Sequence, residues 1–254
     1  MFLLVFICRA LKCDRLQGPG VEIRVGVSTP QHEETGTYNN WCLPQNLTSH
    51  FSPFLKAACL RSFKERHECR IELPEDDARV FTLFVQWMYY GEYHIPTLSE
   101  EASKSFFCIH ARCWILGDKL LCTKFKNYAM SRIYGQHTTS FAPTPVTIQD
   151  VDYVCKNSVL HSKLRTFYFA FVIEHFADQD RLLGTTEEWD KLLLVHADVR
   201  LLMVQSFRMP PEEQMYVEDE EYYLDQDDIL ATSFEKTNIG DDILEQTRDV
   251  RTKN

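Results

Sequence analysis

The sequence predicts an α+β fold, in which a short β-sheet flanked by a cluster of helices is followed by an all-α extension and an acidic tail. The first observation is that residues 21–26 and 69–74 alternate apolar with charged side chains, as half-buried strands do. The second is that most of the remaining chain up to residue 208 carries apolar residues at helical spacing. A chain of 254 residues, 44% of them hydrophobic, can bury a sizeable core.

Changes in composition divide the chain into five parts. We expect an N-terminal extension over 1–18, an α+β domain over 19–135, a Thr-, Ser- and Pro-rich linker over 136–146, a helical extension over 147–208 and an acidic tail over 209–254.

The expected strands lie in the first third of the chain. Gly18-Pro19-Gly20 is a turn signal, and a strand begins after it at about Val21. A polar loop over 27–40 leads to a return strand at 41–43. The third strand, 69–74, ends at Pro74, because proline donates no hydrogen bond to a sheet.

The first helical segment starts at Pro44. Pro53 in its interior predicts either a kink or a division into two shorter helices at Ser52-Pro53. The apolar stripe of this segment consists of Leu47, Phe51, Phe54, Leu55 and Ala58.

Three further helices are expected in the α+β domain, at 78–90, 100–121 and 124–134. The first follows the acidic run Glu75-Asp76-Asp77, which the helix dipole favours at an N-terminus, and it stops at Gly91.

Cap signals at Thr147, Ser162 and Thr185 predict three helices in the extension. We expect the last of them to run on until Pro210-Pro211. Its apolar stripe consists of Trp189, Leu192, His196, Val199 and Met203.

The net charge of −10 belongs to the tail alone. Residues 209–254 contain fourteen Asp and Glu against four Lys and Arg, whereas acidic and basic residues balance in the preceding 208. Low aliphatic content together with this charge predicts disorder. The tail repeats a short motif that is a candidate for partner binding, the alternative being a tail that is only solvated. The candidate residues are Asp227, Asp228, Ile229, Leu230, Asp241, Asp242, Ile243 and Leu244.

The usual catalytic and phosphate-binding motifs are absent from the sequence, so we assign no catalytic residue, no cofactor and no metal. The spacing of Cys108, His110 and Cys113 does not place three ligands on one helical face, and a buried histidine beside core cysteines is the preferred interpretation. The acidic balance and the lack of a basic cluster argue against direct binding of nucleic acid.

Nine cysteines without a C-x-x-C pair, mostly within apolar runs, are typical of reduced thiols. The apolar runs 2–8 and 167–173 are too short to span a membrane. We therefore expect an intracellular protein of the cytoplasm, the nucleus or both, with no membrane association.

Five pieces, in this order, resemble the BTB/POZ domain of many small fungal proteins. A weaker resemblance to the helical extension of those proteins continues through Tyr153-Val154-Cys155 and Glu188-Trp189-Asp190. The five pieces are Ser52-Pro53-Phe54-Leu55-Lys56-Ala57-Ala58-Cys59, Phe63-Lys64-Glu65, Ile71-Glu72-Leu73-Pro74-Glu75-Asp76-Asp77, Phe84-Val85-Gln86-Trp87-Met88-Tyr89-Tyr90-Gly91 and Trp114-Ile115-Leu116-Gly117-Asp118-Lys119-Leu120.

The resemblance implies a protein-interaction module without catalytic activity that forms a homodimer through its N-terminal part, up to about Leu60. Many members are adaptors that bring substrates to a cullin-based ubiquitin ligase, and others assemble transcriptional regulators. Phe63, Lys64 and Glu65 match the apolar-x-Glu pattern of cullin-binding members, the alternative being a core Phe beside a solvated Glu.

One departure from the family bears on the dimer. Pro44-Gln45 stands where members usually have a His-Lys pair, in the charged pocket at the dimer centre. Two other functions remain open at this point. One is a transcription-associated scaffold that contacts regulators through its acidic tail, and the other is an enzyme whose site assembles only in space.

Overall fold

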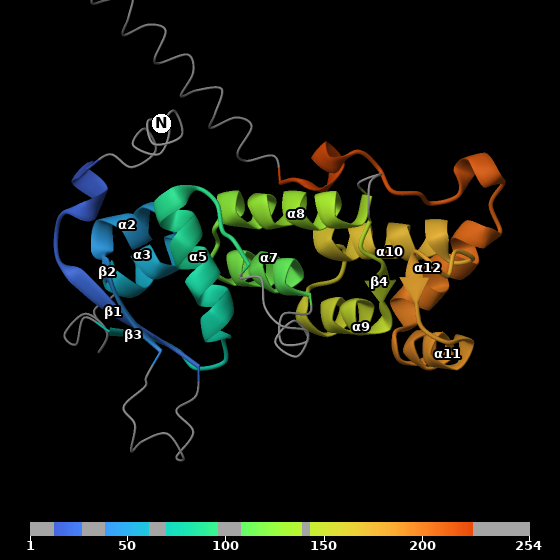
Figure 1. Ribbon diagram of the computed structural model, residues 1–254, viewed down its shortest axis with the longest axis horizontal. Helices are drawn as coiled ribbons and strands as arrows, with labels where there is room; N and C mark the ends of the chain where they lie inside the picture. The colour runs from blue at the N-terminus through green and yellow to red at the C-terminus, as the bar shows by residue number, and fades with distance from the viewer. Residues whose placement is uncertain (1–12, 27–38, 61–69, 96–107, 139–142, 226–254) are drawn as a thin grey trace, which may run out of the picture.

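The computed structural model describes residues 13–26, 39–60, 70–95, 108–138 and 143–225. Figure 1 shows an elongated arrangement with the three-stranded sheet and its helices at one end. The hairpin of α7 and α8 lies in the middle, and α9 to α12 lie at the other end. The described part is an α+β structure that is mostly helical, as predicted.

The sheet has the order β2-β1-β3, with β1 (Gly20–Val25) antiparallel to β2 (Asn40–Pro44) and parallel to β3 (Arg70–Leu73). Val21, Ile23 and Val25 are buried. On the outer face, the Glu22 carboxylate lies 3.0 Å from the guanidinium groups of both Arg24 and Arg70. The predicted alternation is present in β1, and all three predicted strands are confirmed by their observed bounds.

The first helical segment is divided into two shorter helices at Ser52-Pro53, which is one of the two predicted outcomes. A single residue, Ser52, separates helix α2 (Gln45–Phe51) from α3 (Pro53–Leu60). The buried Ser52 lies at the break, where its hydroxyl accepts a hydrogen bond from Leu55 N and donates one to Leu120 O. This contact ties the helix pair to the end of α7.

Helix α5 (Ala78–Tyr90) begins and ends where the sequence predicts. Asp77 accepts a hydrogen bond from Arg79 N at its start, and Gly91 ends it with a φ of 75°. Such a left-handed conformation suits glycine because glycine has no Cβ.

The next two helices differ from the predicted bounds. Helix α7 runs over Ile109–Lys119, and residues 96–107 lie outside the described part. Helix α8 (Thr123–Thr138) extends beyond the predicted end at 134, into the expected linker. The linker predicted to begin at residue 136 therefore begins later, because the helix continues to Thr138.

His110 and Tyr93 form a buried pair in the core, with Tyr93 Oη 2.7 Å from His110 Nδ1. Burial lowers the pKa of His110 to about 3, with a further contribution from the Arg132 charge. The imidazole is therefore neutral in the folded protein at pH values where an unfolded histidine, with a pKa near 6.5, takes up a proton.

We expect the free energy of unfolding to fall by about 2 kcal/mol between pH 7 and pH 5 from this histidine alone. The unfolded state binds more protons than the folded state in this range, so stability is present above the unfolded pKa and is lost as the pH falls below it. Urea unfolding of the wild type and of His110→Gln at the two pH values measures this effect. An equal loss of unfolding free energy in both proteins would contradict the assignment of this pH dependence to His110.

The C-terminal helices are α9 (Ile148–Asn157), α10 (Lys163–His175), α11 (Thr186–Val195) and α12 (Ala197–Phe207). Thr147 and Thr185 each form a reciprocal capping box, and Ser162 caps α10, which confirms all three start signals.

Two predictions for this region were wrong. It is not purely helical, because β4 (Val146–Thr147) pairs in parallel with β5 (Leu182–Leu183). The helix from Thr185 is not continuous either, because it breaks at His196, whose backbone is non-helical. The apolar stripe continues across the break with Val199 and Met203 buried, so apolar spacing alone could not reveal it.

Residues 209–225 form an ordered C-terminal strap, drawn in red in Figure 1, that returns from α12 toward α8. The Tyr223 side chain is 1% exposed, and its ring centroid lies 5.3 Å from that of Phe167. Lys126 Nζ lies 2.6 Å from the Asp225 carboxylate. The prediction of disorder from residue 209 is therefore corrected for this segment, because its aromatic residues find partners on α8 and α10 that composition does not reveal.

The buried apolar residues form one continuous cluster from Val21 in the sheet to Tyr223 in the strap. Among the described helices, none combines the length and the apolar composition that a bilayer crossing requires.

Candidate functional site

The interaction residues named from the sequence lie outside the described residues. Phe63, Lys64 and Glu65 fall within 61–69, and both copies of the tail motif fall within 226–254. These assignments stay predictions.

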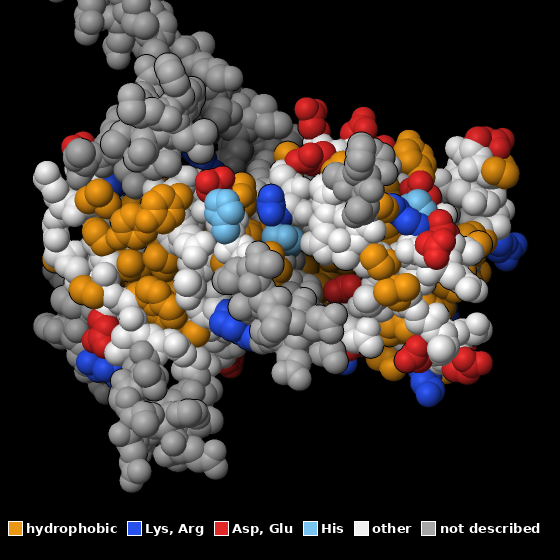
Figure 2. All heavy atoms as spheres, viewed as in Figure 1, with side chains coloured by type: hydrophobic (Ala, Val, Ile, Leu, Met, Phe, Trp, Pro, Cys, Tyr) orange, Lys and Arg blue, Asp and Glu red, His pale blue; other side chains and the backbone are white. Residues whose placement is uncertain are grey.

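One apolar surface lies at the sheet end of the molecule. Figure 2 shows hydrophobic side chains gathered there, over α2 and α3. Phe54 at the start of α3 and Leu16 in the short helix η1 (Cys13–Leu16), which packs on α2, are 36% and 44% exposed. Phe51 and Ala57 are half-buried beside them in sequence. We call Leu16, Phe51, Phe54 and Ala57 together the α2–α3 surface.

A second apolar surface lies at the opposite end, on α11 and α12, where Figure 2 also shows exposed hydrophobic side chains. Leu201 and Val204 are three residues apart and so share one face of α12. We call this the α11–α12 surface. Its exposed members are Leu194, Val195, Leu201, Val204 and Phe207.

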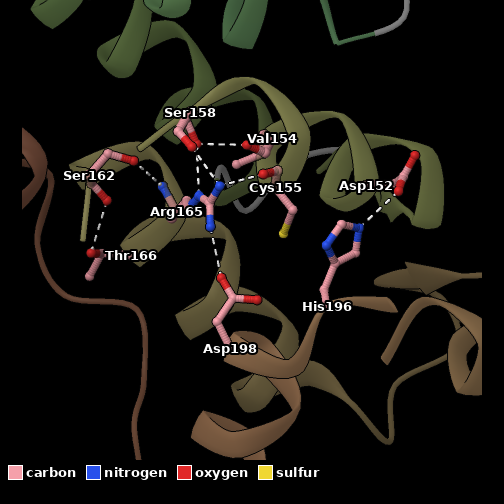
Figure 3. A network of polar contacts seen from close by, with 9 residues as sticks. All are labelled: Asp152, Val154, Cys155, Ser158, Ser162, Arg165, Thr166, His196 and Asp198. Atoms are coloured by element: carbon pink, nitrogen blue, oxygen red, sulfur yellow. Dashed lines mark hydrogen bonds and ion pairs between the residues drawn. The ribbon is translucent and has the colours of Figure 1, made fainter. Parts of the chain in front are cut away.

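A polar cluster between α9, α10 and α12 is drawn in Figure 3. Its centre is the buried side chain of Arg165. The guanidinium donates to Asp198 Oδ2 at 2.8 Å and to Ser158 Oγ at 3.1 Å, and its second Nη donates to the carbonyl oxygens of Cys155 and Ser158. Arg165 thereby binds the C-terminal end of α9 to the first turn of α12.

The other side of the cluster contains a histidine and a thiol. His196 Nε2 lies 2.9 Å from Asp152 Oδ1, and ligand atoms of Cys155, His196 and Asp198 all lie within 4.8 Å of one another. Burial, together with the Asp198 carboxylate, raises the pKa of the Cys155 thiol to about 12. The thiol is therefore protonated, and a protonated thiol is a poor nucleophile, which argues against covalent catalysis by Cys155.

Sequence reasoning did not find this cluster. The sequence places His196 on the apolar stripe of a predicted helix. Its contact with Asp152 and its nearness to Cys155 follow only from the packing of α9 against α11. Cys155 lies about forty positions before His196 and Asp198, so the three residues show no spacing that a short ligand motif could capture. The residues weighed as ligands from their spacing were Cys108, His110 and Cys113. Of these, His110 is hydrogen-bonded to Tyr93, and Cys113 is buried in the core.

Comparison of the sequence with protein-family models gives no match, and no curated protein matches the chain.

Proposed function

We propose that this chain is a non-enzymatic interaction protein that self-associates through a BTB/POZ-like N-terminal domain and recruits partner proteins. The single observation that carries the proposal is the α2–α3 surface, which exposes an aromatic side chain on a helix pair that is itself anchored in the core through Ser52 and Leu120. The order of strand, strand, helix pair, strand and helices supports it as well, because this is the order in which the BTB/POZ resemblance arises.

An apolar surface on a rigid support is stabilised when a second copy of the chain covers it. A twofold axis through the α2–α3 surface would bring each exposed residue into contact with the same surface of the partner, which removes apolar area from water twice. Neutral composition of the chain up to residue 208 leaves little long-range repulsion between the copies, apart from the acidic tail.

The finer form of the proposal is an adaptor of a cullin-type ubiquitin ligase, which Phe63, Lys64 and Glu65 support through the family resemblance alone. In this form, the α11–α12 surface at the far end of the molecule is the place for the recruited protein, because it exposes apolar side chains on two helices.

We expect the wild-type chain to be a dimer at micromolar concentration in size-exclusion chromatography with light scattering. Phe54→Asp is expected to weaken the dimer on the order of a hundredfold, because two carboxylates would be buried without partners. Phe207→Asp on the α11–α12 surface is the matched control and should leave the dimer intact. A monomeric wild type, or equal effects of the two substitutions, would refute the proposal.

A further inference from the structure

Three potential metal ligands of different chemistry converge in the polar cluster from separate positions in the fold. Cys155 lies near the end of α9, His196 lies at the break between α11 and α12, and Asp198 lies in the first turn of α12. Their ligand atoms all lie within 4.8 Å of one another, and Cys155 is buried while the other two residues are half-buried. Sulfur, nitrogen and oxygen donors therefore face one small space.

The orientation of His196 is fixed by a carboxylate on the far side of its ring. His196 Nε2 lies 2.9 Å from Asp152 Oδ1. In the neutral imidazole that a metal requires, Nε2 would donate its proton to this carboxylate and Nδ1 would carry the free lone pair. Figure 3 shows this Nδ1 edge turned toward the sulfur of Cys155. A carboxylate that holds the distal N–H of a metal-binding histidine is the usual way in which proteins fix the ring and raise its basicity.

Asp152 is itself held in place by a second partner. Lys156 Nζ lies 2.6 Å from Asp152 Oδ2, which leaves Oδ1 for the histidine. The orienting carboxylate is therefore fixed from the side that faces away from the imidazole.

Asp198 is positioned by Arg165, which binds only one of the two carboxylate oxygens. Arg165 Nη1 donates to Oδ2, and no hydrogen bond to Oδ1 occurs within the described residues. A carboxylate can bind a guanidinium through one oxygen and a metal through the other. Arg165 thus sets the direction of Asp198 without occupying the atom that a metal needs.

We propose that Cys155 Sγ, His196 Nδ1 and Asp198 Oδ1 bind one Zn²⁺ ion. The mixture of thiolate, imidazole and carboxylate is typical of zinc and unsuited to Mg²⁺ or Ca²⁺, which take oxygen ligands. Ligand bonds of about 2.0–2.3 Å put tetrahedral donors about 3.3–3.8 Å apart, so the donors close up by about 1 Å on binding. The thiol proton of Cys155 is released to solvent, and a water molecule completes the tetrahedron.

The bound ion would connect α9 with the break between α11 and α12. Binding to this folded arrangement, and more weakly to the unfolded chain, raises the stability of the helical extension. The site would therefore hold the two helices of the α11–α12 surface at a defined angle.

The test is titration of the full chain with Co²⁺, which reports thiolate binding by a charge-transfer absorption, followed by competition with Zn²⁺. We expect the absorption at one equivalent in the wild type and in the control Cys42→Ser, whose thiol is exposed and far from the cluster in sequence. Cys155→Ser should abolish it, and Asp152→Asn should weaken binding about 10–100-fold. No thiolate band in the wild type, or a band that persists in Cys155→Ser, would overturn the proposal.

A second measurement needs no variant and so does not depend on whether one folds. Cys155 is the only cysteine after Cys122, so a peptide that contains it can be followed by mass spectrometry without ambiguity. One equivalent of Zn²⁺ should slow alkylation of Cys155 in the wild-type chain and leave that of Cys42 unchanged. Equal alkylation of Cys155 with and without zinc would count against the site even if the chain binds metal elsewhere.

Discussion

Replacement of Arg165 by alanine is expected to lower the free energy of unfolding by about 3–5 kcal/mol, the largest effect of any single change considered for this protein. The guanidinium is buried and makes hydrogen bonds to Asp198, to Ser158 and to the carbonyl oxygen of Cys155. Alanine would leave the Asp198 carboxylate half-buried without its partner, and the carbonyl groups at the end of α9 without a donor. Urea unfolding followed by circular dichroism measures the loss.

Two further variants distinguish the hydrogen bonds of the Arg165 guanidinium from the effect of its positive charge. Arg165→Lys keeps the charge but cannot reach Asp198 and the two carbonyl groups together, so an intermediate loss of stability is expected. Arg200→Ala, on the exposed face of the same α12, should change the unfolding free energy by less than about 0.5 kcal/mol. If Arg165→Ala proved as mild as Arg200→Ala, the cluster would not be what joins α9 to α12.

Tyr223→Ala is expected to cost about 3 kcal/mol and to release the C-terminal strap from the body. The ring is 1% exposed and packs against Phe167 and Tyr134, and its hydroxyl accepts a hydrogen bond from Glu218 N. Removing the ring leaves a cavity between strap and helices and deletes the strap's one fully buried side chain within the described part of the chain. Urea unfolding gives the energy, and limited proteolysis over residues 209–225 reports the release.

The neighbouring residue provides the control for this experiment. Tyr222 is 50% exposed and contacts Lys163 Nζ at 4.2 Å from its ring centroid, so Tyr222→Ala should cost about 1 kcal/mol or less. Equal protease sensitivity of the wild type and Tyr223→Ala would show that the ion pair of Lys126 with Asp225 and the hydrogen bonds of Asn127 hold the strap by themselves.

The strap also changes the interpretation of the charge. The tail accounts for the whole net charge of −10, and its first part is not free in solution but lies across α8 and α10. Lys126 pairs with the Asp225 carboxylate, and Lys163 donates a hydrogen bond to the Tyr222 carbonyl oxygen, so both basic residues lie where the strap touches the helices. In the sequence, the first Asp-Asp-Ile-Leu copy begins two residues after this anchored segment, at Asp227, and the second begins at Asp241.

Local structure could be predicted from the sequence wherever the signal involves neighbouring residues. Alternation in β1, the Asp77 and Gly91 ends of α5, and the capping boxes at Thr147 and Thr185 all depend on residues a few positions apart, and all are present. The α+β class followed from the same signals. These features could be predicted because backbone preference and hydrogen bonding act over one or two turns of chain.

The contacts between distant segments could not be predicted in this way and became known from the folded structure. The break at His196, the buried Tyr223 and the convergence of Cys155, His196 and Asp198 each depend on contacts between residues far apart in the chain. Composition predicts disorder for residues 209–225 because the segment has few apolar residues. It carries no information on the residues of α8 and α10 that contact this segment. The reason is physical, since burial and ligand geometry arise from packing in space, whereas periodicity and charge report only on the chain's own neighbours.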